Sequence, residues 1–168
     1  MLAKLIVEGK EFDIEILDPK LQELIAPTKK TGYERVKYDQ MYWYDRGLGV
    51  VERDCEEQCD VDDDAYDAAN YYSDATIAVH NARADKLMRQ LRRFAVEHRV
   101  IDLNWQDEDL PKWSIFYDYN TRKLQGWDLY SNREFFSIVF DSKESVELAI
   151  ETFHDELIWY FTEYKDSL

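Results

Sequence analysis

The stretch WSIFYDYNTRKLQGWDLYSNREFFSIVF, residues 113–140, is the strongest β-forming region of the chain. It consists of aromatic and β-branched runs separated by turn residues, the first of them at 120–122. Short runs of this kind are typical of antiparallel strands. We therefore predict a three-stranded meander with strands at 113–119, 124–130 and 134–140.

The residues that follow predict a helix reaching nearly to the C-terminus. Asp141 and Glu144 have the spacing of a capping box, with Asp in place of the more usual Ser or Thr. Apolar residues then recur at three- and four-residue steps, which marks one helical face: Val146, Ala149, Ile150, Phe153, Leu157, Phe161 and Tyr164. We expect this face to pack on one side of the meander and form a two-layer unit.

A second long helix is predicted from a cap at Ser73 to about His98. Its apolar positions also follow a helical period: Ile77, Ala84, Leu87, Leu91 and Phe94. Because the final helix already covers the sheet in this prediction, apolar surface is left over for a twofold partner. We therefore expect a homodimer with this long helix at or near the interface.

The N-terminal part predicts two β-hairpins. One pairs 5–7 with 12–16, and the other pairs 42–44 with 50–51 around a glycine-containing turn. A short helix is expected over 19–26, and the breaker cluster at 27–32 predicts a domain boundary. The expected organisation is a small N-terminal unit, 1–28, and a main domain, 29–168. The expected fold class is α+β: an antiparallel sheet of a C-terminal meander and N-terminal hairpins, packed with two long helices.

Charge restricts the class of partner. The 168 residues include 36 Asp and Glu against 21 Lys and Arg, a formal net charge of −15. Nucleic acids and anionic membranes bind cationic surfaces, so neither is expected as a direct ligand. A host protein with a basic surface is the expected partner.

The sequence predicts a cytoplasmic protein. No run approaches the roughly 18 apolar residues of a membrane-spanning helix, and Lys4 and Glu8 interrupt the start too early for a signal peptide. The two cysteines, Cys55 and Cys59, do not form a disulfide framework of the secreted kind.

Most of the net charge lies in one segment. Between 54 and 82 there is no Lys or Arg, and the remaining 27 acidic and 21 basic residues of the chain nearly cancel. We predict an exposed loop over 54–69 and either a solvated surface or a contact surface for a basic partner. The candidate partner-binding residues are Asp54, Glu56, Glu57, Asp60, Asp62, Asp63, Asp64, Asp67 and Asp74.

A metal site or a catalytic site in this segment has less support from the sequence than a solvated or partner-binding surface. Asp60, Asp62 and Asp64 match the first ligands of an EF-hand loop, but Ala65 replaces its glycine and Tyr71 its bidentate glutamate. The two cysteines lack a paired histidine motif that would complete a zinc site. No nucleophile motif or phosphate loop is present in the sequence. We expect no metal, no cofactor and no catalytic residue.

The long helix carries a basic set that opposes the overall charge: Arg83, Lys86, Arg89, Arg92, Arg93 and Arg99, the last just past its end. Two interpretations stay open. Either these residues pair with acidic groups, within the chain or across a dimer, or the helix binds nucleic acid.

Several stretches resemble a group of small acidic proteins encoded by phages and prophages of Gram-positive bacteria. They are KTGYERV at 30–36, YWY at 42–44, KLMRQLRRFA at 86–95, DLNW at 102–105, IFYDY at 115–119, VFDS at 139–142 and DELIWYF at 155–161. None is a chemical motif, so the resemblance implies no catalytic residue.

The resemblance implies a functional class. Small acidic phage proteins often act by binding host proteins, and anti-CRISPR proteins are similar in size and charge. The predicted function is a non-enzymatic inhibitor of a host defence nuclease, acting as a DNA mimic through the acidic segment. The alternative is a phage structural or regulatory interaction module in which the aromatic meander or the long helix makes the contacts.

Overall fold

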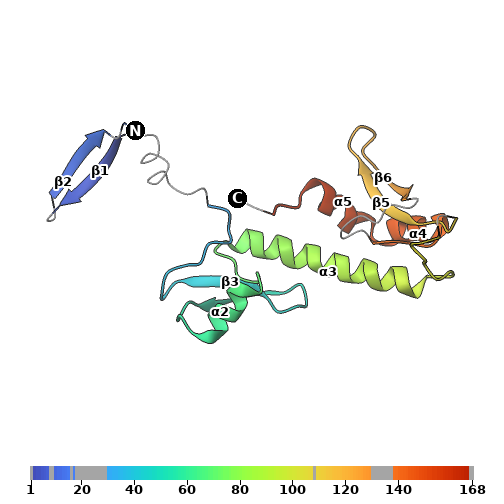
Figure 1. Cartoon of the computed structure of the whole chain (residues 1–168), viewed down its shortest axis with the longest axis horizontal. Coiled ribbons are helices and arrows are strands. Elements are labelled where there is room, and N and C mark those ends of the chain that lie inside the picture. The colour runs from blue at the N-terminus through green and yellow to red at the C-terminus, as the bar shows by residue number, and fades with distance from the viewer. Residues whose placement is uncertain are drawn as a thin grey trace. The chain divides into compact units, whose positions relative to one another are not determined.

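The computed structural model describes residues 2–7, 10–15, 17, 30–107, 109–129 and 138–166. The chain divides into two compact units, 1–30 and 31–168, which are described separately (Figure 1). Strands in the described part form three separate two-stranded antiparallel sheets. The predicted α+β class is therefore confirmed, whereas the predicted arrangement of strands is not. No described helix is long and apolar enough to cross a membrane.

The first unit contains the expected hairpin. β1 (Leu2–Val7) pairs antiparallel with β2 (Lys10–Glu15), in a register that runs from Leu2 opposite Glu15 to Val7 opposite Lys10. The helix expected over 19–26 and the boundary expected after residue 28 lie outside the described residues.

The second unit begins with the other expected hairpin. β3 (Met41–Asp45) pairs antiparallel with β4 (Val51–Cys55). Gly47 and Gly49 in the turn have φ of +83° and +73°, a region that disfavours side chains. At Gly49 a Cβ would also lie 2.8 Å from Lys86 Cδ, so glycine lets the turn approach the long helix closely.

The exposed loop predicted over 54–69 is wrong. β4 continues to Cys55, and α2 (Asp60–Asp67) forms a helix of two turns. Its first turn carries Asp60, Asp62 and Asp63, which the positive end of the helix dipole stabilises. The Asp62 carboxylate also accepts from the Cys59 backbone, closing a capping box. Capping and charge, rather than an apolar stripe, stabilise this helix.

α3 (Ala75–Glu97) is the long helix predicted from the sequence (Figure 1). Its N-cap is Asp74 and not Ser73, because the Asp74 carboxylate accepts from the N–H groups of Thr76 and Ile77. All five predicted apolar positions are buried. Ile77 packs with Tyr72, Tyr33, Trp43 and Val51, whereas Leu87, Leu91 and Phe94 belong to a second cluster under the C-terminal sheet.

The predicted three-stranded meander is wrong. β5 (Trp113–Asp118) and β6 (Lys123–Asp128) form a two-stranded sheet. At Phe140 the described chain makes only an isolated bridge, in which Trp113 and Phe140 exchange backbone hydrogen bonds of 2.9 and 2.8 Å. Of the expected third strand, 134–140, residues 134–137 lie outside the described residues.

The final helix is also divided. α4 (Lys143–Thr152) is capped at its C-terminal end by Phe153, and α5 (His154–Thr162) follows at once. Ser142, not Asp141, is the N-cap, and it accepts from the N–H of Ser145 at 3.1 Å. The long helix therefore has two shorter companions instead of one long one.

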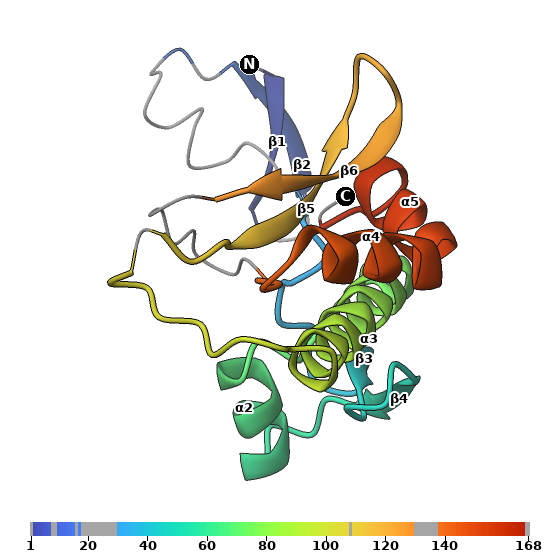
Figure 2. The ribbon, with the colours of Figure 1, turned by 90° about the vertical axis from the view of Figure 1, so that its right-hand side faces the viewer.

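The predicted packing of this region is confirmed. Val146, Ala149 and Leu157 are fully buried, and α4 lies against the β5–β6 sheet (Figure 2). A Cβ at Gly126 would lie 2.5 Å from Val146 Cγ1, which shows how closely the helix approaches the sheet.

Candidate functional site

The nine predicted partner-binding residues divide into buried and exposed groups around α2. Glu56 and Asp62 are 1% and 2% exposed, whereas Asp54, Glu57, Asp60, Asp63, Asp64 and Asp67 are exposed. Asp74 is half-buried and serves as the α3 cap. The segment is thus a folded element with an ionic interior, not a uniformly solvated surface.

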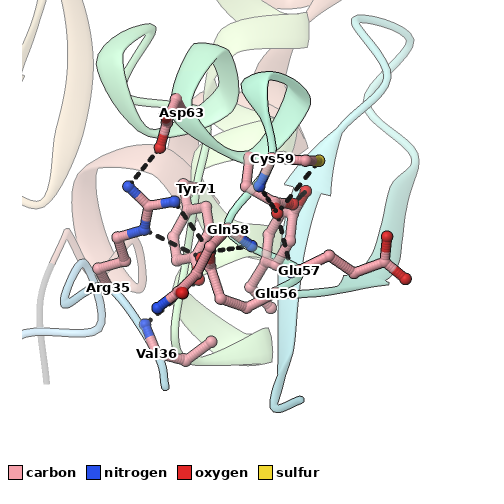
Figure 3. Close-up of polar contacts among 10 residues, drawn as sticks. Arg35, Val36, Glu56, Glu57, Gln58, Cys59, Asp63 and Tyr71 are labelled. Atoms are coloured by element: carbon pink, nitrogen blue, oxygen red, sulfur yellow. Dashed lines mark hydrogen bonds and ion pairs between the residues drawn. The ribbon is translucent and has the colours of Figure 1, made fainter. Parts of the chain in front are cut away.

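Glu56 is held by a dense set of donors. Arg35 binds it through two nitrogens, at 3.0 and 2.8 Å, and the Tyr71 hydroxyl donates at 2.7 Å (Figure 3). The N–H of Gln58 adds a fourth donor at 3.0 Å. The Arg35 guanidinium keeps the pKa of Glu56 below its usual value despite burial, and the Tyr71 hydroxyl adds to the effect. Glu56 is therefore an ionised structural group.

Asp62 is saturated in a similar way. Its Oδ2 accepts from the N–H groups of Glu57 and Cys59 at 2.8 and 3.2 Å and from the Cys59 thiol at 3.4 Å. Its Oδ1 accepts from the Tyr42 hydroxyl at 3.0 Å. Burial acts to raise the pKa of Asp62, but these donors, backbone N–H of Cys59 first, hold it below the usual value.

Two stacked tyrosines connect the buried carboxylates. The Tyr42 and Tyr71 rings lie 4.0 Å apart at 12°, and each hydroxyl donates to one carboxylate, Asp62 and Glu56 respectively. Burial, followed by these hydrogen bonds, raises the pKa of both phenols, so they stay protonated donors. The pair joins β3, α2 and the segment before α3 into one rigid assembly.

Arg35 also reaches the exposed side of α2. Its Nη1 lies 2.6 Å from Asp63 Oδ1 (Figure 3). Its guanidinium also lies over the Tyr66 ring, 5.7 Å from the ring centroid. Hydrogen bonds to Glu56 and then Asp63 raise the pKa of Arg35. One arginine therefore connects the turn before α2 to the helix itself.

The exposed carboxylates of α2 share one face. At about 100° per residue, Asp60, Asp63, Asp64 and Asp67 fall within about 100° of arc. Asp63 is shared with Arg35, while Asp60, Asp64 and Asp67 extend into solvent. We call these four residues the α2 acidic face. It is a row of negative charges on a helix that is held in place by the contacts of Asp62 with Tyr42 and of Asp63 with Arg35.

The positions of these side chains do not fit the calcium and zinc sites considered from the sequence. Asp60, Asp62 and Asp64 lie on a helix and not on the loop that an EF-hand requires, and the Asp62 oxygens are already occupied. The Cys59 thiol contacts Asp62 and the Cys55 thiol contacts Asp39. Among the described residues, no group of three or more His, Cys, Asp or Glu side chains is placed to hold a metal ion.

Sequence reasoning missed Arg35, Tyr42 and Tyr71, which hold the site together. Glu34 was missed as well: it accepts from the N–H of Thr31, of Gly32 at 3.1 Å and from the Ser73 hydroxyl at 2.9 Å. No sequence signal singles out Arg35, because Lys37, Arg46 and Arg53 lie between it and the acidic segment. Nothing local predicted its pairing, because Arg35 and Glu56 are 21 residues apart.

Comparison with known proteins adds no assignment to this geometry. No protein-family model matches the chain, and neither the curated proteins nor the solved structures include a match.

Proposed function

We propose that this chain is a non-enzymatic, phage-encoded inhibitor of a host defence nuclease of the CRISPR type, and that the α2 acidic face occupies the nuclease's nucleic-acid channel. The observation that carries the proposal is the separation of the acidic residues. Glu56 and Asp62 are buried and fully hydrogen-bonded, while Asp60, Asp64 and Asp67 are exposed on one helical face. A solubilising segment does not need such an ionic support.

Preorganisation is the physical advantage of this arrangement. Effector channels bind the phosphate backbone through its charge and shape, so spaced carboxylates on a rigid helix can compete there. Ordering a flexible acidic loop on binding would cost about 0.5–1.5 kcal/mol for each immobilised side chain in addition to backbone ordering. The α2 backbone is already ordered before binding, because Arg35 and the two tyrosines hold it in place. Binding therefore does not carry the backbone part of this cost.

The expected partner is a protein and not a nucleic acid. The net charge of −15 opposes direct binding to a phosphate backbone. The resemblance to phage proteins supports a role in the host bacterial cytoplasm, where defence nucleases act.

A panel of purified defence nucleases tests the proposal. Each is incubated with the immobilised chain, and its cleavage activity is measured with increasing amounts of free chain. We expect capture and inhibition of at least one nuclease, with binding that weakens steeply as salt rises, because surface charges are screened. Capture that is indifferent to salt, or inhibition that persists after α2 is neutralised, would rule out the acidic mechanism.

One observation favours the alternative of an interaction module without a defence role. On the β5–β6 sheet, Trp127 is 58% exposed and meets Phe116 edge-on at 5.6 Å, on the face opposite the core. Exposed aromatic pairs of this kind are enriched at protein interfaces. Under this alternative, Trp127→Ala abolishes partner binding and neutralising α2 does not.

A further inference from the structure

The basic residues of α3 differ in how firmly the chain itself neutralises them. Arg83 is fully engaged: it binds Glu156 of α5 through two nitrogens, at 2.8 and 3.1 Å, and its guanidinium lies 3.9 Å from the centroid of the Trp159 ring. Lys86, by contrast, is exposed and forms no ion pair with any residue in the described part of the chain. Charge pairing within the chain therefore accounts for Arg83 but not for Lys86.

Arg89 and Arg93 are only loosely paired. Arg89 lies 3.8 Å from Asp45, and Arg93 lies 3.7 Å from Glu97, both close to the outer limit of an ion pair. Lys86, Arg89 and Arg93 are spaced by three and four residues, so they share one face of the helix, where like charges repel each other. An anion bound among the three would relieve this repulsion.

These three cations line a hollow beside the β3–β4 turn. Its volume is about 260 Å³, and its walls are Gly47, Leu48, Lys86, Arg89, Gln90 and Arg93. No acidic residue is among these walls. Pockets for drug-sized ligands usually measure about 300–1,000 Å³, so this hollow suits a smaller ligand. We call it the α3 basic hollow.

One buried carboxylate holds both sides of the hollow in place. The Asp45 side chain is 9% exposed; its Oδ1 accepts from the N–H of Gly49 in the turn at 3.1 Å, and its Oδ2 faces Arg89 on the helix. The Asn70 amide fixes the Asp45 backbone through two hydrogen bonds of 2.8 Å. Gly49 lets turn and helix approach closely, since a Cβ there would lie 2.8 Å from Lys86 Cδ. The hollow is therefore formed before any ligand binds.

The chemistry of the walls fits phosphate groups. An arginine guanidinium binds phosphate oxygens through two parallel N–H groups, and a lysine ammonium adds a compact charge. Gln90 adds an uncharged amide donor. Lys86 and Arg93 are about 10 Å apart along the helix axis, so two linked phosphate groups can use more of the cations than one. We propose that the α3 basic hollow binds a diphosphate, either free or as part of a nucleotide.

The rest of the chain favours a small ligand over a nucleic acid. The net charge of −15 opposes a long polyanion that extends past the hollow. At physiological ionic strength the Debye length is about 8 Å, so a small anion interacts with the adjacent cations more strongly than with distant acidic residues. In Figure 2, α2 lies at the lower left and the β3–β4 hairpin at the lower right. Binding in the hollow therefore leaves the α2 acidic face free, and the inference does not rest on the proposed function.

An NMR titration of the isotope-labelled chain with inorganic pyrophosphate tests the site. We expect saturable changes in the amide signals of Gly47, Leu48 and residues 86–93, with a dissociation constant below about 1 mM at low salt. Orthophosphate should bind more weakly, because it presents one phosphate group instead of two. The absence of saturable changes at these residues would overturn the proposal, and so would orthophosphate binding as tight as that of pyrophosphate.

Two variants with the same loss of positive charge separate the hollow from the helix as a whole. One carries Lys86→Gln and Arg93→Gln in the hollow, and the control carries Arg92→Gln and Arg99→Gln outside it. All four side chains are exposed, and circular dichroism verifies that both variants fold. We expect pyrophosphate binding to weaken at least about tenfold in the first and to stay within about twofold in the control, because hydrogen bonds between charged groups are the strong ones. Equal weakening of both variants would contradict a site in the hollow.

ADP and a short single-stranded oligonucleotide distinguish the possible sources of the phosphate groups. Tighter binding of ADP than of pyrophosphate, lost in Leu48→Ser, would identify a nucleotide ligand, with the apolar contact supplied by Leu48, which is 70% exposed. Equal binding of ADP and pyrophosphate would identify the diphosphate group alone as the ligand. An oligonucleotide that binds more tightly than either would overturn the proposal and assign the basic residues to nucleic acid.

Discussion

Glu56 and its neighbour Glu57 show that adjacent residues of the same type have opposite roles here. The Glu56 carboxylate is buried with four donors, whereas the Glu57 side chain is exposed and contributes its backbone N–H to Asp62. Both were predicted as partner-binding residues because their local sequence is the same. Burial of Glu56 depends on Arg35 and Tyr71, which are distant in the chain, so no local pattern distinguishes the two.

Replacing Glu56 tests this division. Glu56→Gln removes the ionic partner of Arg35 and presents an amide to the Tyr71 and Arg35 donors. We expect a loss of about 2–3 kcal/mol in the free energy of unfolding, less than for a fully buried ion pair because Arg35 is one-third exposed. The matched control Glu57→Gln should change it by less than about 0.5 kcal/mol. Urea titration of both variants decides; equal effects would contradict the assigned roles.

Acid should weaken the same network. The pKa values of Glu56 and Asp62 lie below their usual values in the folded chain, because of Arg35 in the first case and of N–H donors that outweigh burial in the second. Their contribution to stability is therefore complete above the unfolded pKa values of about 4.3 and 3.9, and is lost as pH falls through the folded values. Each group contributes a slope of up to about 1.4 kcal/mol per pH unit.

The measurement is urea unfolding from about pH 6 down to about pH 3. Glu56→Gln should show a shallower loss over this range than the wild type, because one of the two linked groups has been removed. Parallel curves for the two proteins would mean that Glu56 is not ionised and paired in the folded chain.

Elements that carry an apolar stripe were predictable, and elements stabilised in other ways were not. The five apolar positions of α3 were identified from periodicity, as were the buried Val146, Ala149 and Leu157 of α4 and α5, whereas the buried Trp159 was missed. α2 was missed because its stability comes from N-terminal carboxylates and a capping box, which leave no apolar period. The break between α4 and α5 was missed because the apolar spacing continues across Phe153.

Phe153 links the two short helices to α3. Its ring meets Phe94 edge-on at 5.5 Å, and it is packed against the C-terminal cluster. We expect Phe153→Ala to cost about 2–4 kcal/mol, at the lower part of the range for aromatic truncation because Phe153 is only partly buried. Leu148→Ala on the exposed face of α4 is the control and should cost less than about 1 kcal/mol. An unchanged melting temperature for Phe153→Ala would contradict the packing of α4 and α5 on α3.

At the scale of the whole molecule, charge and apolar surface are distributed differently from the expectation. The predicted dimer drew on spare apolar surface along the long helix, but those positions are buried within the second unit. What α3 leaves exposed is its basic residues together with Val79 and Val96.

The central claim is that position on α2, and not net charge, makes the acidic face a binding surface. Two variants with the same loss of charge separate the two explanations. One carries Asp60→Asn, Asp64→Asn and Asp67→Asn on α2, and the other carries Glu147→Gln, Glu151→Gln and Asp155→Asn on α4 and α5, where all three side chains are also exposed.

The decisive measurement is the dissociation constant of the wild type and both variants for a captured nuclease, at physiological salt. We predict that the α2 variant binds at least about tenfold more weakly, equivalent to about 1.4 kcal/mol, and that the α4–α5 variant stays within about twofold of the wild type. Equal weakening of both variants, or no weakening of the α2 variant, would contradict the account.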